Sequence, residues 1–255
     1  MSESILQLDD ISVTFDRFKA VQHVSTSVEK GELRFFIGPN GAGKTTLLDV
    51  ICGKTKPVSG RVLFKGENIL GKQEYEIVKT GIGRKFQVPS VFVSLTVYQN
   101  MELAVVRSKS LFASVFSKIT RNEKEHIRTV LEKTGLSGLE QTVAGTLSHG
   151  QKQWLEIAML LVNGHELLLM DEPVAGMGRT ETEMTGNLLR EVSKTCAVIV
   201  VEHDMEFVRN FSSRVTVLHE GQVLCEGPME TVQSDPRVIE VYLGRGSEEK
   251  HAENP

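Results

Sequence analysis

The sequence predicts an α/β fold, and three observations support this prediction. Short apolar runs such as "LRFFI" at residues 33–37, "LLLM" at 167–170 and "AVIVV" at 197–201 are typical of strands buried on both faces of a sheet. The glycine-rich loop "GPNGAGKTT" at residues 38–46 directly follows the first of these runs. Residues 96–134 show helical periodicity and few strand signals. Together these features predict a parallel sheet core with a helical insertion.

The N-terminal part of the chain is expected to be antiparallel. Residues 4–37 alternate short apolar runs with turn signals, which is typical of strands joined by tight turns. The stretch "GRVLFKGENI" at residues 60–69 predicts a further hairpin with Gly66 in its turn. We therefore expect an N-terminal antiparallel β subdomain beside the core.

Two helix starts are predicted in the second half of the chain. A polar break at "ITRNEKE" predicts a helix with Asn122 as its N-cap. Another helix should begin near Ser148, because apolar residues recur at helical spacing after it, at Trp154, Ile157, Ala158 and Leu161. Ahead of both helix starts, "SLFASVFSKI" at residues 110–119 is interpreted either as helical core or as a surface that docks on a membrane subunit or on lipid headgroups.

Composition limits the function classes. The 255 residues carry a net charge of −4 and are 40% hydrophobic, which argues against a nucleic-acid-binding protein. The three cysteines lack C-x-x-C spacing and favour a reduced compartment. The N-terminal stretch "MSESILQLDD" has no signal-peptide features. No apolar run reaches the ~18 residues needed to cross a bilayer, so a function at a membrane would require another chain to span it.

The glycine-rich loop predicts a phosphate-binding site. Gly38, Gly43, Lys44 and Thr45 match the pattern G-x-x-x-x-G-K-[ST] between a strand and a helix. Glycines let successive backbone N–H groups point inward as an anion nest. Lys44 should reach the β- and γ-phosphates, and the Thr45 hydroxyl should bind Mg²⁺. The alternative is a glycine-rich turn with a surface lysine, and the loop alone indicates no more than an NTPase or a kinase.

Acidic residues and a histidine follow two of the predicted strands. Asp171 and Glu172 end "LLLMDEP", and neighbouring residues on a strand face opposite ways. Asp171 could therefore support Mg²⁺ while Glu172 faces an attacking water. The alternative is an ordinary Asp-Glu-Pro strand stop. His203 follows "AVIVV" and should lie on the same sheet edge, because the carboxyl ends of parallel strands converge there.

A second anion site is predicted ahead of the helix that starts near Ser148. The hydroxyl of Ser148, the glycine Gly150 and the amide of Gln151 could hold an anion at a helix N-terminus. This loop contains no lysine and would bind ATP poorly by itself. The alternative is a simple N-cap with Gln151 as the capping partner.

These motifs together resemble the ATP-binding subunit of ABC transporters. "GPNGAGKTT", Phe86-Gln87, "LSHGQ", "LLLMDEP" and "VEHD" occur in the family's order, and the resemblance covers residues 4–244. It implies a P-loop NTPase (RecA-like) core at about 4–87 and 160–244, including the antiparallel subdomain, and a helical subdomain at about 88–159. Residues 245–255 are expected to be a mobile charged tail.

The resemblance also implies cofactors and partners. The family uses ATP and Mg²⁺, and two copies or two similar subunits meet head to tail, so that the signature motif "LSHGQ" of one caps ATP on the other. Two integral membrane permease subunits and, indirectly, a periplasmic or extracellular solute-binding protein would complete an importer. The chain would lie peripherally on the cytoplasmic face of the inner membrane and bind no nucleic acid.

Site residues carry over by position. Phe15 matches the aromatic that stacks on adenine, with Phe18 as a competitor. Gln87 matches the lid residue that senses Mg²⁺ and the γ-phosphate, Glu172 the catalytic carboxylate and His203 the switch histidine. Thr45, Gln87 and Asp171 would bind the metal. The phosphate loop comprises Gly38, Pro39, Asn40, Gly41, Ala42, Gly43, Lys44, Thr45 and Thr46. The signature comprises Leu147, Ser148, His149, Gly150 and Gln151.

Two positions depart from the family pattern. His149 stands where glycine is usual, so its side chain must point away from a partner's nucleotide. Gly178 stands where many relatives carry an aspartate, which puts signalling through that side chain in doubt.

Within the family, strings such as "GRKFQVPSVF" and "EPVAGM" resemble the branch that imports branched-chain amino acids, amides and urea, and look closest to its urea-importing members. We therefore expect urea as the solute, with branched-chain amino acids or short amides as the alternative. A non-transport ATPase of DNA repair or translation is a remote alternative, because such relatives carry long coiled coils, zinc inserts or two cassettes.

Overall fold

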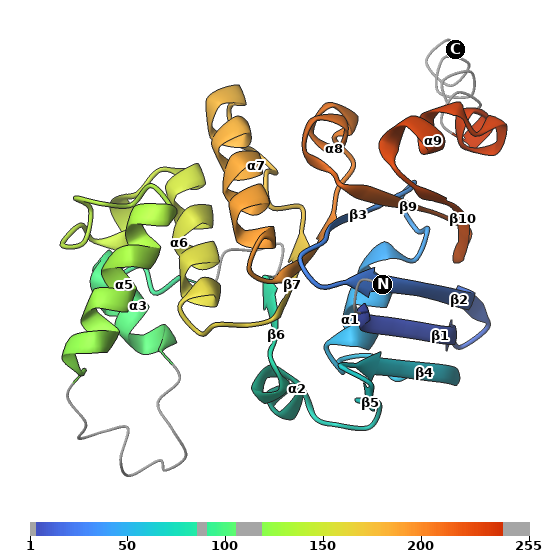
Figure 1. Cartoon of the computed structure of the whole chain (residues 1–255), viewed down its shortest axis with the longest axis horizontal. Coiled ribbons are helices and arrows are strands. Elements are labelled where there is room, and N and C mark those ends of the chain that lie inside the picture. Colours follow the sequence, from blue (N-terminus) through green and yellow to red (C-terminus); the bar gives the residue numbers. More distant parts are fainter. Residues whose placement is uncertain (1–3, 86–90, 106–118, 242–255) are drawn as a thin grey trace.

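The structure, a computed structural model, describes residues 4–85, 91–105 and 119–241, which fold around two sheets (Figure 1). The smaller sheet is antiparallel and has the strand order β2-β1-β4-β5. Its strands are β1 (Ser4–Phe15), β2 (Phe18–Glu29), β4 (Ser59–Phe64) and β5 (Glu67–Asn68). The predicted antiparallel subdomain and the hairpin that turns at Gly66 are therefore confirmed.

The larger sheet has the strand order β10-β9-β3-β8-β7-β6. The five strands from β9 to β6 run parallel, and β10 pairs antiparallel at the edge. Every residue of β3, β7 and β8 is buried, as the continuous apolar runs predict. The strands are β3 (Leu33–Ile37), β6 (Ile82–Lys85), β7 (Leu167–Asp171), β8 (Ala197–Val201), β9 (Arg214–His219) and β10 (Gln222–Gly227).

Two apolar clusters cover the two faces of the larger sheet. One lies between this sheet and the antiparallel sheet and includes α1 (Lys44–Ile51). The other joins the opposite face to α7 (Arg179–Ser193), α8 (Met205–Phe211) and α9 (Met229–Ser234). Figure 1 shows these helices on the side of the sheet away from β1 and β2. A helix at α2 (Glu74–Thr80) precedes β6.

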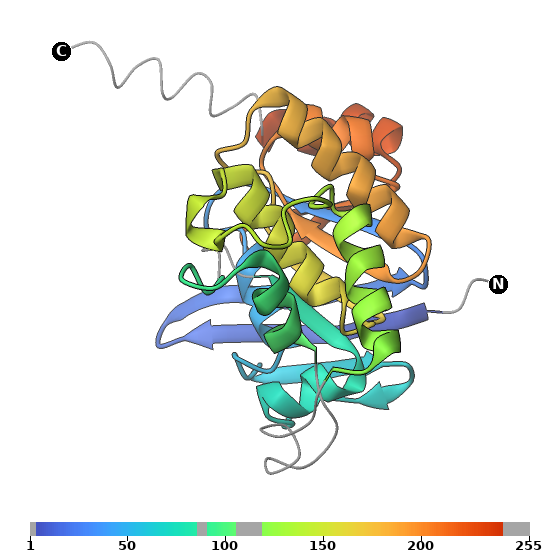
Figure 2. The ribbon, with the colours of Figure 1, turned by 90° about the vertical axis from the view of Figure 1, so that its left-hand side faces the viewer.

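A third apolar cluster is built from helices that stand beside the sheets in Figure 1 and face the viewer in Figure 2. It joins α3 (Val97–Ala104), α5 (Arg121–Lys133) and α6 (His149–Leu161), with the short 3₁₀ turn η1 (Ala144–Thr146) ahead of α6. Lys85 at the end of β6 and Glu156 on α6 form a buried ion pair at 3.4 Å. This pair links the helical cluster to the larger sheet.

The start of α5 differs from the prediction. The N-cap is Thr120, and Asn122 lies inside the first turn. The Thr120 hydroxyl accepts a hydrogen bond from the Glu123 backbone N–H at 3.3 Å, while the Glu123 carboxylate accepts from the Thr120 N–H at 2.6 Å. This reciprocal capping box satisfies two N–H groups at once, so it prevails over a lone asparagine cap. The prediction at Ser148 is confirmed, because Ser148 is the N-cap of α6.

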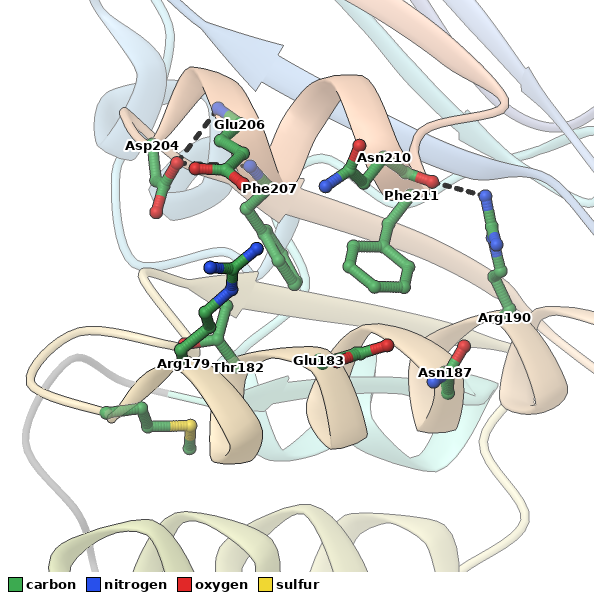
Figure 3. Close-up of a pocket in the computed structure, with 11 residues that line it drawn as sticks. Arg179, Thr182, Glu183, Asn187, Arg190, Asp204, Glu206, Phe207, Asn210 and Phe211 are labelled. Carbon is green, nitrogen blue, oxygen red and sulfur yellow. Dashed lines mark hydrogen bonds between the residues drawn. The ribbon is translucent and has the colours of Figure 1, made fainter.

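Helices α7 and α8 approach closely at one glycine. The Phe211 ring lies against Gly186, where an added Cβ would come within 2.5 Å of three ring atoms. Phe207 packs against Phe211 with ring centroids 5.0 Å apart, and both rings point toward α7 in Figure 3. Arg190 covers the Phe211 ring and donates to the Asn210 carbonyl. A pocket of about 650 Å³ lies between the two helices.

Within the described residues, no helix combines the length and apolar character needed to span a bilayer.

We expect Gly186→Ala to destabilise the fold. The added methyl group must displace the Phe211 ring, and such overpacking costs roughly 1–3 kcal/mol. This cost outweighs the ~1 kcal/mol that alanine gains over glycine in a helix. Denaturant unfolding measures the change. Asn187→Ala, at the exposed neighbouring position, is the control and should change stability by less than about 0.5 kcal/mol. Equal stability of the Gly186→Ala variant and the control would contradict the packing argument.

Candidate nucleotide-binding site

The candidate site lies where three parallel strands of the larger sheet end. β3 runs into the glycine-rich loop, β7 ends at Asp171, and β8 ends at Val201, which directly precedes Glu202. β3 lies between β8 and β9, although β8 is followed along the chain by β9, so the strand order departs from the chain order at this point. The carboxyl edge beside such a switch in strand order is the usual ligand crevice of an open α/β sheet.

The glycine-rich loop is held between two backbone segments. Gly38 has φ 147°, and a Cβ there would lie 2.1 Å from the Leu218 carbonyl oxygen. Gly43 has φ 98°, and its Cβ would lie 2.7 Å from the Ala20 carbonyl oxygen. Any side chain at either position would therefore collide with β9 or β2. The loop needs glycine for both conformation and space, and Gly43 then serves as the N-cap of α1.

Lys44 lies across this loop. Its Nζ donates to the Gly38 carbonyl at 2.8 Å and to the Pro39 carbonyl at 3.1 Å. Burial lowers the pKa of Lys44, while the charges of Glu172 and Asp171 act in the opposite direction. The structure therefore brings the predicted lysine and both predicted carboxylates into one electrostatic environment at the N-terminus of α1.

Asp171 and Thr45 come together beneath the loop. Burial raises the pKa of Asp171, whereas a hydrogen bond with the Thr45 side chain and the charge of Arg84 lower it. Arg84 Nη2 lies 4.0 Å from Asp171 Oδ2. A hydroxyl and a carboxylate in contact are oxygen donors that suit Mg²⁺, which takes its remaining ligands from phosphates and water. The described residues contain no larger metal-binding cluster of His, Cys, Asp or Glu.

Glu172 leaves the strand by a left-handed turn. Its φ is +47°, which is unusual for a residue other than glycine and is often found at functional sites. Its N–H donates to the Val201 carbonyl at 3.0 Å, and its carboxylate lies 3.5 Å from His203 Nδ1. The predicted alternation of strand faces does not apply here, because β7 ends at Asp171. The left-handed turn, rather than the pleat, separates the two carboxylates.

The sequence analysis missed two buried charged groups at this edge. Glu202 is 1% exposed and accepts from the N–H groups of His203 at 3.2 Å and Val174 at 3.4 Å. Burial raises its pKa to about 7. Arg84 pairs with Asp49 at 2.5 Å and donates to Cys52 at 3.0 Å. Glu202 directly follows the apolar run "AVIVV", a signal that could have identified it, whereas Arg84 has no such run beside it.

The predicted signature residues start α6 and contact α7. Ser148 and Gln151 form a capping box, with Gln151 N to Ser148 Oγ at 3.2 Å and Ser148 N to Gln151 Oε1 at 2.9 Å. The alternative reading of this motif as an N-cap is therefore correct within the chain. Ser148 Oγ also lies 3.3 Å from Glu181 Oε1 on α7. Leu147 is buried in the helical cluster, whereas Ser148 is exposed.

The two departures from the family pattern lie beside each other. His149 Nε2 is 3.0 Å from the Ala175 carbonyl oxygen, in the loop that follows Glu172. The Gly178 N–H donates to Glu181 Oε2 at 3.2 Å. Both positions therefore make contacts inside this chain, in the segment that joins β7 to α7.

The remaining predicted residues are exposed or outside the described part. Phe15 and Phe18 are paired across the β1–β2 turn and are 50% and 62% exposed. Ala20, two residues beyond Phe18, approaches Gly43, so the strand that follows the β1–β2 turn leads to the phosphate loop. Adenine stacking by Phe15 or Phe18 stays a prediction. Gln87, the stretch at residues 110–118 and the charged tail at 245–255 lie outside the described residues.

Comparison with known proteins identifies the family. The family described as "ABC transporter" matches residues 21–175. A probable branched-chain amino acid transport ATP-binding protein, LivG of Archaeoglobus fulgidus, is 35% identical over 94% of this chain and 95% of its own length. The chain therefore belongs to the ABC transporter family, as an ATP-binding cassette that hydrolyses ATP. A second family, described as "Branched-chain amino acid ATP-binding cassette transporter", matches residues 222–248.

Solved structures agree with the fold. The ADP conformation of MJ1267, an ATP-binding cassette of an ABC transporter, has a TM-score of 0.83 and 34% identity, covering 95% of this chain and 100% of that one. A dimeric post-hydrolysis state of the cassette MJ0796, bound to ADP and Pi, has a TM-score of 0.74 and 26% identity, covering 88% and 98%. The predicted α/β fold with a P-loop NTPase core is confirmed.

The raised pKa of Glu202 predicts a pH dependence of stability. An ordinary glutamate loses its proton near 4.5, whereas Glu202 in the folded chain does so at about 7. As pH rises from 4.5 to 7, the unfolded chain releases this proton first, so the free energy of unfolding falls, by on the order of 3 kcal/mol from this group. Glu202→Gln cannot titrate and should lack that loss.

The measurement is denaturant unfolding of the nucleotide-free chain at pH 5 and pH 8. Relative to the wild type, Glu202→Gln should become more stable as the pH rises, and other titrating groups cancel in this difference. Parallel pH dependence of the two proteins would contradict the assigned pKa.

Proposed function

We propose that this chain is the ATP-hydrolysing subunit of an importer for branched-chain amino acids. The main observation that supports this solute is the match of residues 222–248 to the cassette family named for these amino acids. Relatives named for branched-chain amino acid transport match nearly the whole chain as well. None of these names supports urea, which the sequence analysis expected, so the former alternative becomes the proposal and urea becomes an outcome of the test.

The chemistry at the sheet edge assigns a role to each residue. Lys44 and the loop N–H groups would hold the β- and γ-phosphates, and α1 adds its positive N-terminal end. Thr45 and Asp171 would hold Mg²⁺, which neutralises the developing phosphate charge when it is bound. Glu172 would orient and deprotonate the attacking water, since its turn carries the carboxylate toward Lys44. His203 contacts Glu172 and would report on the γ-phosphate.

The signature motif would act on the ATP of a second subunit. Ser148 is exposed, and its side-chain contacts are to Gln151 and Glu181, both outside the phosphate loop. A helix N-terminus without a lysine adds N–H groups and a dipole to an anion that is already bound elsewhere. The dimer of the related cassette MJ0796 supports a paired assembly. The partner subunit would be identical or homologous, and ATP would bind the two together.

Membrane permease subunits would dock near the start of the helical cluster. Phe92 and Val93 are 52% and 58% exposed. Val143 is 43% exposed, and the N–H of the next residue, Ala144, donates to the Leu95 carbonyl, two residues after Val93. Exposed apolar side chains gathered in this way are typical of interaction sites. A peripheral position on the cytoplasmic face of the inner membrane and an indirect link to a solute-binding protein complete the proposal.

Glu172→Gln tests the catalytic assignment. The amide keeps the shape of the side chain but cannot take a proton, and loss of a general base lowers turnover by roughly 10²-fold or more. ATP should still bind. Because it is not hydrolysed, a stable dimer of the protein should accumulate, which size-exclusion chromatography with ATP detects. The control is Glu166→Gln, which removes an exposed carboxylate paired with Lys65 and should leave turnover within about twofold. A fully active, monomeric Glu172→Gln variant would rule out the assigned role.

Uptake in cells tests the solute. Cells lacking this chain should lose import of labelled leucine, and the wild-type gene but not Glu172→Gln should restore it. Labelled urea is measured in the same cells. Restoration of urea import without leucine import would refute the proposed solute and return the assignment to urea.

A further inference from the structure

The His149 side chain joins the signature helix to the loop that follows the catalytic carboxylate. Its Nε2 lies 3.0 Å from the Ala175 carbonyl oxygen. A carbonyl only accepts hydrogen bonds, so this contact is a hydrogen bond in the form of the imidazole that carries a proton on Nε2. The ring also lies beside Gly176, whose added Cβ would be 3.3 Å from the same nitrogen. Gln153, which is 1% exposed, borders the ring with its amide nitrogen at 3.4 Å.

The loop from Glu172 to Gly178 is fixed at both ends by carboxylates. The Val174 N–H donates to Glu202 at 3.4 Å, and the Gly178 N–H donates to Glu181 at 3.2 Å. Gly176, in the middle, has φ +74° and is exposed. Among the described side chains, His149 is the one that bonds to the backbone between these two anchors, and it comes from another helix.

His149 therefore spans two functional elements of one chain. It is the first residue of α6, directly after Ser148. Its hydrogen-bond partner Ala175 lies three residues after Glu172, and the Ala175 N–H bonds to the Glu172 carbonyl at 3.3 Å. A glycine at position 149 would leave the Ala175 carbonyl without this donor.

We propose that His149 is a positioning residue that fixes the Glu172–Gly178 loop against the signature helix and so couples the two ATP sites of the assembled pair. The inference rests on the proposed function, because Glu172 acts on the ATP of its own subunit and Ser148 on that of the partner. When Ser148 engages the partner's nucleotide, the His149 bond transmits the position of α6 to the loop beside Glu172. The hydrogen bond, rather than the bulk of the ring, carries this coupling.

Three substitutions separate the hydrogen bond from the bulk. His149→Gln places an amide N–H where Nε2 lies, His149→Phe keeps a ring without a donor, and His149→Ala removes both. We expect the Phe and Ala variants to lose roughly tenfold in kcat, since small misplacements of a catalytic group have effects of this size. The Gln variant should retain more than half of the wild-type kcat. ATP affinity of the isolated chain should stay within twofold in all three, because the Lys44 loop is unchanged.

His126→Phe is the matched control. His126 also directs Nε2 at a backbone carbonyl, that of Val162 at 3.2 Å, within the same helical cluster, and its loss should leave kcat within twofold. Trp154, the single tryptophan of the chain, is buried and donates to Thr185 Oγ1 at 2.9 Å between α6 and α7. Its fluorescence should be unchanged in every His149 variant, which shows that the helix interface is intact.

The readouts are ATP turnover by the assembled pair and ATP binding by the isolated chain. The proposal would be overturned if the Phe and Ala variants kept the wild-type kcat, or if the Gln variant lost as much kcat as they do. Altered Trp154 emission in any His149 variant would also overturn it. These assays do not depend on the solute. A wild-type pair that hydrolyses ATP but imports no leucine would refute the proposed solute while leaving the His149 comparison valid.

Discussion

Burial of charge at the carboxyl edge of the larger sheet is the constraint on which the rest of the site depends. Lys44 is 9% exposed, Asp171 6% and Glu202 1%. A buried charge is costly unless it is paired or hydrogen-bonded. Lys44 therefore needs the loop carbonyls and the nearby carboxylates, and Asp171 needs Thr45 and Arg84. The loop conformation and the positions of the strand ends are consequently fixed by one another.

The same constraint extends to the helical cluster. Arg84 and Lys85 are adjacent on β6, their side chains are 6% and 0% exposed, and they pair in different directions. Arg84 faces Asp49 and Asp171 in the core, whereas Lys85 faces Glu156 on α6. Because breaking a buried pair leaves an uncompensated charge, α6 cannot separate from β6 without cost. Two neighbouring residues of one strand thus connect the Asp171 side of the site to α6.

Local patterns predicted the elements of this fold well. Continuous apolar runs identified β3, β7 and β8, and glycine spacing identified the phosphate loop, because each signal lies within a few residues of the feature it specifies. The predicted N-cap of α5 was wrong because the search considered single capping residues. It overlooked the reciprocal hydrogen bonds between Thr120 and Glu123. The orientation of Glu172 was inferred from strand alternation, but its left-handed backbone has no local sequence signature.

Pairs of distant residues could not be predicted in this way. Arg84 is bonded to Asp49, and Lys85 to Glu156, across long stretches of sequence. Only the strand order brings these residues together, and one sequence contains no direct record of that order. The solute posed a different problem, since an ATPase subunit need not contact it. The sequence resemblance that favoured urea lay in a few short strings, whereas the matched C-terminal segment and the whole-chain relatives carry names of branched-chain amino acid transport.

The two readings of the signature motif are chemically compatible. A serine hydroxyl has one proton to donate and lone pairs to accept. Within the chain, Ser148 Oγ accepts from the Gln151 N–H and faces Glu181 Oε1 with its proton. The cap therefore uses a lone pair, whereas a partner's γ-phosphate would need the proton. In the proposed dimer, phosphate and the Glu181 carboxylate would compete for that one proton, and their like charges would repel. Closing the dimer would then require Glu181 to release Ser148, whereas the bond between the other Glu181 oxygen and the Gly178 N–H need not break.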